Sequence, residues 1–161
     1  GRHLGHGAGT TSSPAIALRG APEHFGDDPR LARAAEALGL RVVADDTWSD
    51  LFSKILSEKI ETQLGCGRPT LLCDYPISEA ALARVNPDDP RFADRFELYA
   101  CGVELANGFG ELTDPNEQRR RLEAQMVEKA RLYGERYPVD EDFLAALAIM
   151  PAASGVALGL D

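Results

Sequence analysis

The sequence has no long apolar run of the kind that crosses a membrane. Its 161 residues contain no stretch of about 18 consecutive apolar side chains, and the first 25 residues lack the apolar core of a signal peptide. Basic side chains are outnumbered, with 17 Lys and Arg against 26 Asp and Glu and a formal net charge of −9. Such a balance disfavours a broad surface for nucleic-acid phosphates. These absences predict no membrane partner and favour an acidic enzyme, or one whose macromolecular partner carries basic residues.

Cysteine is scarce, and familiar signatures of nucleotide and hydrolase sites are missing. The three cysteines, Cys66, Cys73 and Cys101, form no CxxC pair, which argues against a zinc site and a disulfide framework. The cysteines therefore predict reduced thiols in a cytoplasmic protein.

The chain also has no GxxxxGKS/T loop, no GxGxxG after a predicted strand and no GxSxG turn.

Length and composition predict one folded domain preceded by a loop. Hydrophobic residues make up 44% of the chain, an ordinary share for a globular protein. Residues 1–26 are rich in Gly, Ser, Thr and Pro without apolar periodicity, so we expect a loop or disorder there. His3 and His6 lie in this segment, but no third ligand is near, which favours a flexible tail over a metal pair. Residues 27–161 are then the folded domain.

Apolar periodicity and capping residues predict helices at both ends of this domain and strands between them. Residues 40–44 suit either a short strand or a packed linker, and residues 70–75 suit a buried strand. Strands joined as a hairpin favour an α+β fold, with an antiparallel sheet flanked by helices. The predicted helices cover about residues 29–38, 49–64, 80–83, 115–133 and 141–149, and the other strands are 96–100 and 103–106, the last ended by Asn107-Gly108.

The helix predicted at 115–133 has a strong start and a basic run. Asp114 suits the N-cap, Pro115 the first helical position and Gly134 the stop. The residues at 119–121 are all arginine, for which a solvated face is favoured over phosphate contact. The predicted apolar side of this helix comprises Leu122, Met126, Ala130 and Tyr133.

The two central strands predict a hairpin closed by Cys101-Gly102. A two-residue turn places Tyr99 opposite Glu104. Glu97 then lies on the same face, as a diagonal neighbour of Glu104 roughly 7–8 Å away. Two carboxylates on one face repel each other unless a cation lies between or above them. The hairpin therefore predicts a cation site.

The hairpin and the segments around it resemble a known enzyme family. The stretch RFELYACGVELANGFGELTDPNEQRRR, with SGVALGLD at the C-terminal end, is similar to the catalytic domain of class II lysyl-tRNA synthetases. It looks closest to their shorter paralogues, the elongation factor P lysine aminoacylases, because of ELTD at 111–114 and DYP at 74–76. The resemblance covers about residues 40–161 and implies an incomplete class II synthetase catalytic domain.

This resemblance implies an ATP site on the hairpin. Glu97 and Glu104 match the acids that bind ATP through magnesium in this family, and they are the pair that the hairpin geometry brings together. Leu105 matches a backbone contact to the nucleotide, and Gly159 matches a glycine that lines the ATP site. ATP and Mg²⁺ are therefore the implied cofactors.

The resemblance also implies an amino-acid site beside the ATP site. Asn107 matches the residue that orients the amino acid's carboxylate, to which an amide can donate without adding charge. Glu111 matches the acid that receives the ε-ammonium of lysine, and Phe109 matches an aromatic side chain beside it. Lysine or β-lysine is the implied substrate.

Membership of this family would imply a two-step ligase reaction. Lysine or β-lysine would be activated by ATP as an aminoacyl-adenylate and transferred to a lysine of elongation factor P, or to tRNA in the synthetases. The net acidity leans toward the protein acceptor. The alternatives are a lysyl-tRNA synthetase fragment and a degenerate, non-catalytic paralogue. The full-length family also implies a homodimer.

The match leaves out the family's phosphate-binding arginines. Residues 1–26 do not match the upstream segment that carries one of them, and the chain ends at Asp161, where the family continues with another. Residues 149–151 also lack a glycine that the family usually has before the methionine. We therefore expect a partial catalytic domain that is inactive on its own, and the sequence assigns no catalytic residue.

Overall fold

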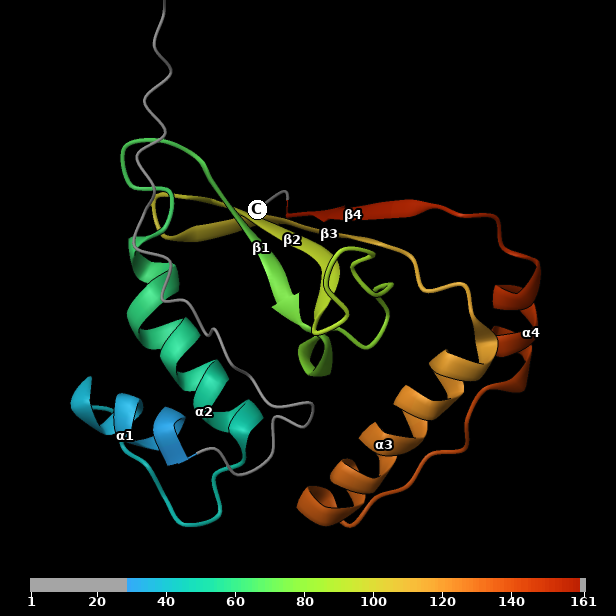
Figure 1. Ribbon diagram of the computed structural model, residues 1–161, viewed down its shortest axis with the longest axis horizontal. Helices are drawn as coiled ribbons and strands as arrows, with labels where there is room; N and C mark the ends of the chain where they lie inside the picture. The colour runs from blue at the N-terminus through green and yellow to red at the C-terminus, as the bar shows by residue number, and fades with distance from the viewer. Residues whose placement is uncertain (1–28, 160–161) are drawn as a thin grey trace, which may run out of the picture.

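A four-stranded antiparallel sheet organises the computed structural model, which describes residues 29–159 (Figure 1). The strands lie side by side in their sequence order, and each neighbouring pair is antiparallel. The predicted α+β class is confirmed, whereas the loop expected at residues 1–26 lies outside the described residues. The strands are β1 (Thr70–Pro76), β2 (Phe92–Ala100), β3 (Val103–Gly110) and β4 (Ser154–Leu158).

Two pairs of helices lie toward opposite ends of the sheet (Figure 1). In the first pair, α1 (Pro29–Ala37) packs on α2 (Trp48–Ile55), as the apolar periodicity predicts. Residues 40–44, between these helices, form a linker and not a strand. The buried residues that join the pair are Leu31, Ala35, Leu40, Leu51 and Ile55.

The second predicted helix changes its geometry along its length. Thr47 caps α2 in a capping box, in which the Asp50 N–H donates to the Thr47 hydroxyl and the Thr47 N–H donates to the Asp50 carboxylate. The chain then continues as a π-helical turn (Leu56–Ile60) and a 3₁₀ turn (Glu61–Gln63). The prediction of one helix over 49–64 therefore has the right extent but misses these two changes.

The hairpin turn between β2 and β3 is confirmed. Cys101 and Gly102 both lie in the left-handed region, with φ of 53° and 75°. Two consecutive positive φ values match the twist of the flanking strands, which is why a two-residue turn fits here. The turn sets Tyr99 opposite Glu104, as predicted.

Beyond this turn, β3 contains a β-bulge at Leu105. Tyr99 pairs with Glu104, but Leu98 pairs with Ala106, so Leu105 is an extra residue on β3. The prediction that Asn107-Gly108 ends the strand is wrong, because β3 continues to Gly110. Pairing with strands on both sides outweighs the local turn preference of these residues.

The segment from β1 to β2 differs from its prediction in two respects. β1 was expected to be buried, yet Leu71 is 60% exposed, because β1 is an edge strand of the sheet. The helix expected at 80–83 is absent, and the chain instead forms a 3₁₀ turn at Ile77–Glu79, followed by turns that bridge to the sheet.

The strand β4 has no counterpart among the predicted elements. Its five residues pair with β3, setting Asn107 opposite Ala157 and Phe109 opposite Gly155. A short run that contains glycine has little strand propensity of its own, so its pairing with β3 defines it.

The second helical pair begins and ends as predicted. α3 (Pro115–Tyr133) is capped by Asp114 and ends at Gly134, which has φ of 70°, and α4 (Glu141–Ile149) is capped by Asp140. Within residues 29–159, no helix is long and apolar enough to cross a membrane.

The apolar side predicted for α3 is only partly buried, because Leu122, Met126 and Ala130 are half-buried and Tyr133 is exposed. Tyr133 is 71% exposed, and the buried residues of the helix are Gln118 and Arg121. Both are held by carbonyl groups of the segment after β1: Gln118 donates to Ala81, and Arg121 donates to Ala80 and Ala83. Polar contacts therefore join the first half of α3 to the domain.

Candidate functional site

One face of the sheet gathers most of the residues that the sequence singled out. Directly paired residues point to the same side of a sheet, and alternate residues of a strand share that side. We call this side the site face, and it carries Arg95, Glu97 and Tyr99 from β2 and Glu104, Asn107 and Phe109 from β3.

The bulge at Leu105 makes this grouping possible. Glu104 and Asn107 are three residues apart, a spacing that points to opposite faces in a regular strand. The extra residue restores the pairing of Asn107 with Glu97 while Tyr99 remains opposite Glu104. The predicted diagonal neighbours, Glu97 and Glu104, therefore do share a face, but Asn107 stands directly opposite Glu97.

Glu97 is the centre of a hydrogen-bond network. It is 5% exposed, and each carboxylate oxygen accepts two hydrogen bonds. Oε2 accepts from the hydroxyls of Tyr75 and Tyr99, the latter at 2.6 Å. Oε1 accepts from Arg95 at 2.5 Å and from the Asn107 amide at 3.1 Å. All the usual acceptor positions of this carboxylate are thus occupied.

Arg95 supplies a positive charge beside Glu97. Its second nitrogen donates to the carbonyl of Glu79 at 2.6 Å, and its guanidinium lies 4.2 Å from the centre of the Tyr75 ring. This arginine already places a positive charge beside Glu97, which the predicted cation site did not include. The available signal was spacing, since Arg95 precedes Glu97 by two residues on a strand and so shares its face.

Both tyrosines in the network remain hydrogen-bond donors over the ordinary pH range. Burial raises the pKa of Tyr75 and of Tyr99 well above the usual value, and their hydrogen bonds to the Glu97 carboxylate raise it further. Tyr75 reaches the site face through a second irregularity, at Asp74 (φ 58°), where the β1–β2 register shifts.

Glu104 differs from Glu97 in having no hydrogen-bond donor among residues 29–159. It is exposed, and its pKa is raised, first by partial desolvation and then by the negative charge of Glu97. A carboxylate with this repulsion and free acceptor positions is suited to bind a cation.

Glu111 is a second free carboxylate on the same side. A Cβ atom added at Gly155 would lie 2.8 Å from Glu111 Oε1, so the carboxylate lies over the glycine of β4 that pairs with Phe109. No described residue donates to this carboxylate. Phe109 itself packs against the alanine cluster of Ala80, Ala83 and Ala93.

The remaining predicted residues lie around the bulge. The Gly159 N–H donates to the Leu105 carbonyl at 3.0 Å, which links the two residues expected to contact the nucleotide. The Asn107 amide oxygen is buried and has no partner, although a buried acceptor is ordinarily satisfied. It is an open position for a donor from a bound molecule.

The oxygen atoms of these side chains suit Mg²⁺, but they are not equally free to bind it. Carboxylate and amide oxygens are the ligands that this hard cation prefers, and it usually binds through one or two protein carboxylates plus water and phosphate. No cluster of three or more His, Cys, Asp or Glu suited to a metal occurs in the described part of the chain. Glu104 is free to bind directly, whereas the acceptor positions of Glu97 are occupied by donors of the chain.

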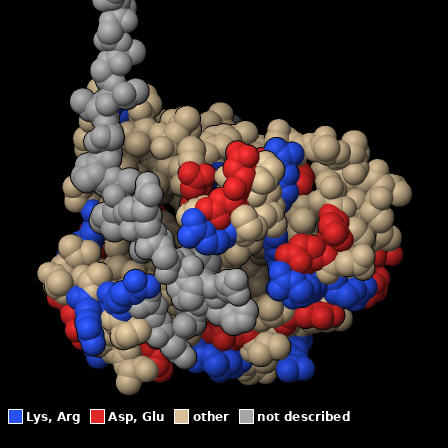
Figure 2. Space-filling model, viewed as in Figure 1, with Lys and Arg blue, Asp and Glu red and all other residues tan. Residues whose placement is uncertain are grey.

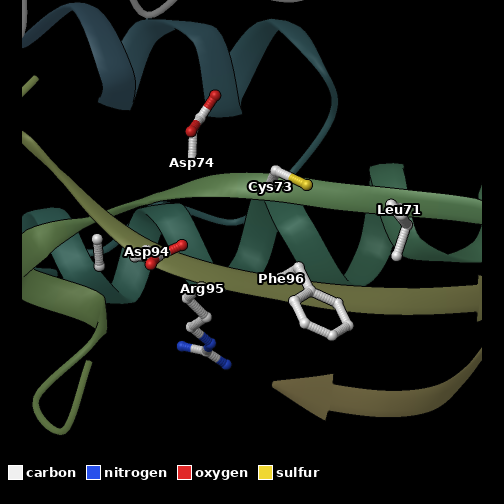
Figure 3. A pocket seen from close by; sticks show the side chains of 7 residues that line it. Leu71, Cys73, Asp74, Asp94, Arg95 and Phe96 are labelled. Atoms are coloured by element: carbon white, nitrogen blue, oxygen red, sulfur yellow. The ribbon is translucent and has the colours of Figure 1, made fainter. Parts of the chain in front are cut away.

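A pocket elsewhere on the sheet contains none of the seven predicted binding residues. It lies between β1 and β2 and is lined in part by Cys73, Asp74 and Arg95, of which Arg95 points away from the other two (Figure 3). The remaining lining residues are Leu71, Ala93, Asp94 and Phe96.

The arginine run on α3 forms ion pairs within the chain. Arg119 pairs with Glu141, and Arg120 and Arg121 pair with Glu117 at 2.7 and 2.8 Å. These bonds, that from Arg120 first, lower the pKa of Glu117 to about 2. Acidic and basic side chains are interspersed on the face in Figure 2. The side chains of Arg119 and Arg120 are exposed, as predicted for a solvated face, whereas Arg121 is buried and the prediction is wrong for it.

Comparisons with known proteins extend this description. Residues 46–161 match the family model described as tRNA synthetases class II (D, K and N). The elongation factor P–(R)-beta-lysine ligase of Haemophilus influenzae (strain PittGG) is 43% identical over 146 residues, or 86% of this chain and 45% of that protein. The lysine–tRNA ligase of Gloeobacter violaceus is 42% identical over 136 residues, or 84% of this chain and 27% of that protein. The chain thus spans less than half the length of these curated relatives.

Proposed function

We propose, since this chain belongs to the family of class II tRNA synthetases (D, K and N), that it carries the amino-acid site and part of the nucleotide site of an ATP-dependent lysine ligase. The observation that carries the proposal is the site face, where a strand bulge groups Glu104 and Asn107 beside Glu97. The relatives named as lysine and β-lysine ligases support the substrate class.

Glu111 is the proposed selector for lysine. Its carboxylate lies over Gly155 and has no donor among the described residues, so it can accept the ε-ammonium of a bound lysine. Asn107 still has one amide hydrogen that Glu97 does not use, and this hydrogen can donate to the substrate's carboxylate. One acid and one amide would thus hold the two ends of the amino acid.

Glu97, Glu104, Leu105 and Gly159 are the proposed nucleotide-side residues. Glu104, with Glu97 beside it, would hold Mg²⁺, and the Leu105–Gly159 segment would lie against the nucleotide. Bound ATP and Mg²⁺ would supply the activated phosphate and neutralise its charge. The chain's own contribution is to fix these acids on one rigid face, because most of the rate in such chemistry comes from positioning and electrostatics.

A lysine of elongation factor P is the proposed acceptor, and tRNA is the alternative. The net charge of −9 supports a protein acceptor, since a polyanionic RNA is repelled by an acidic chain. The 42% identity to a lysine–tRNA ligase, close to the 43% identity to an elongation factor P ligase, supports the alternative. Titration of the chain with elongation factor P and with tRNA at one ionic strength separates the two, and tighter binding of tRNA would contradict the proposed acceptor.

Calorimetric titration with lysine, with and without ATP and Mg²⁺, tests the amino-acid site. Glu111→Gln removes the charge that matches the ε-ammonium, so we expect lysine affinity to fall at least about 30-fold, equivalent to about 2 kcal/mol. Glu36→Gln, an exposed change on α1, is the matched control and should leave the affinity unchanged.

Two results would contradict the proposed function. One is the absence of lysine binding by the unaltered chain, which is also the result that a degenerate, non-catalytic paralogue would give. The other is equal binding of leucine and lysine, since leucine carries no charge for Glu111 to recognise.

A further inference from the structure

We propose that Arg95 is a positioning residue of this site, which holds Glu97 and, through Glu97, the amide of Asn107. It would thereby connect the metal side of the site to the amino-acid side without touching either ligand. The naming of these two sides rests on the proposed function, whereas the connection itself rests on the contacts within the chain.

The guanidinium of Arg95 is fixed on three sides. One nitrogen donates to the Glu79 carbonyl at 2.6 Å, the other donates to Glu97 Oε1 at 2.5 Å, and the Tyr75 ring lies 4.2 Å away. The side chain is 20% exposed and that of Glu97 only 6%. A planar fork held in this way fixes its partner's orientation as well as its charge, which the single point charge of a lysine does not.

Glu97 transmits this order to Asn107. An ionised carboxylate only accepts hydrogen bonds, so the Asn107 amide must turn its nitrogen toward Oε1. Its oxygen then takes the buried position in which it has no partner. The Asn107 amide keeps one N–H and its oxygen for a ligand. Glu97 sets the direction in which both point, and Arg95 holds Glu97.

The two tyrosines hold the other carboxylate oxygen but cannot replace Arg95. Tyr75 and Tyr99 both donate to Oε2, so they leave Oε1 with Asn107 alone when the arginine is removed. The buried carboxylate would then lack a counter-charge, and its orientation would no longer be fixed on the Oε1 side. Loss of Arg95 should consequently disturb two binding functions at once.

Arg95→Gln tests the inference first without any ligand. The readout is the Asn107 side-chain amide in ¹H–¹⁵N spectra of the 17.4 kDa chain, assigned by its loss in Asn107→Ala. We expect the amide signals to shift and to exchange faster with water in Arg95→Gln, with Arg95→Lys intermediate. Arg84→Gln is the control, because it removes an exposed ion pair to Asp94, the neighbour of Arg95 on β2. It should leave the Asn107 amide signals unchanged.

Titrations with lysine and with Mg²⁺–ATP give the second readout. Supporting residues of this kind typically change affinity by about 10-fold to 100-fold, so we expect Arg95→Gln to weaken both ligands by at least about tenfold. In an Asn107→Ala background, Arg95→Gln should have no further effect on lysine, because its influence passes through the amide. Thermal unfolding of each variant confirms that it is folded at the titration temperature.

The outcomes separate the inference from the proposed function. If the unaltered chain binds neither ligand, the proposed function fails, and the Asn107 amide signals still decide the role of Arg95. If the chain binds both ligands and Arg95→Gln leaves the amide signals unchanged, the inference is overturned. It is also overturned if only one ligand is weakened, or if the effects of Arg95→Gln and Asn107→Ala on lysine add independently.

Discussion

Glu97 and Glu111 are two acids on one sheet face with opposite surroundings. Glu97 is buried and accepts hydrogen bonds from two tyrosines, an arginine and an asparagine. Glu111 lies over a glycine and accepts from no described residue. The difference indicates that Glu97 supports the structure of the site, whereas Glu111 is available to a ligand.

Glu104 lies between these extremes. It is exposed, and like Glu111 it accepts from no described residue, but partial desolvation and then the negative charge of Glu97 raise its pKa. The fold therefore uses Glu97 far more than the other two acids, and substitution of Glu97 should affect stability more than substitution of Glu104 or Glu111.

The largest expected effect on stability belongs to Glu97→Gln. Removing the charge leaves the part-buried Arg95 without its counter-ion, and breaking a buried pair in this way typically costs about 3–5 kcal/mol. Glu111→Gln should change the free energy of unfolding by less than about 0.5 kcal/mol. Urea denaturation of both variants measures the difference, and equal stabilities would contradict the division between framework and ligand-binding acids.

A smaller effect is expected when one tyrosine hydroxyl is removed from the network. Tyr99→Phe deletes a buried hydrogen bond to a carboxylate, which should lower the free energy of unfolding by about 1.5–3 kcal/mol. Tyr137→Phe is the matched control, because its hydroxyl bonds the Glu135 carboxylate in an exposed place. If the two variants prove equally stable, the hydroxyl at Tyr99 does not support Glu97.

A small effect on stability that depends on pH is expected for Glu104→Gln. The folded-state pKa of Glu104 is raised above 4.5, so the protonated form is favoured in the fold, and that stabilisation is lost as pH rises through the folded pKa. The variant should match the unaltered chain at pH 4 and exceed it at pH 7 by about 0.5 kcal/mol, since solvent screens an exposed group. Denaturation at both pH values checks the sign, and a variant less stable at pH 7 than at pH 4, relative to the unaltered chain, would reverse the assignment.

Local signals in the sequence were sufficient for the helices and the hairpin turn. Asp114 and Gly134 mark the two ends of α3 as its caps, and Cys101-Gly102 closes the hairpin because both residues adopt positive φ. Each of these signals lies within a few residues of chain. The strand β4 required its pairing with β3, and the exposure of β1 depended on its place at the sheet edge. Neither property is encoded in the short segment itself.

The site was predicted in part for a similar reason. The resemblance supplied the acids and the amide, and strand alternation placed Glu97 with Glu104. Arg95 precedes Glu97 by two residues, so the same alternation places it on that face, although it was not among the predicted site residues. Tyr75 could not have been placed, because it reaches Glu97 from another strand through an irregular register at Asp74.

The extra residue at Leu105 imposes a counting rule on this segment. That single extra residue determines which side of the sheet every position from Ala106 to Glu111 faces. The odd spacing of three between Glu104 and Asn107 can therefore be recognised in a sequence as the sign of a bulge. An insertion of one residue between them, with the bulge retained, would move Asn107 to the opposite side of the sheet. A chain of this type that keeps both residues at an even spacing would need a straight strand, and could then dispense with the bulge altogether.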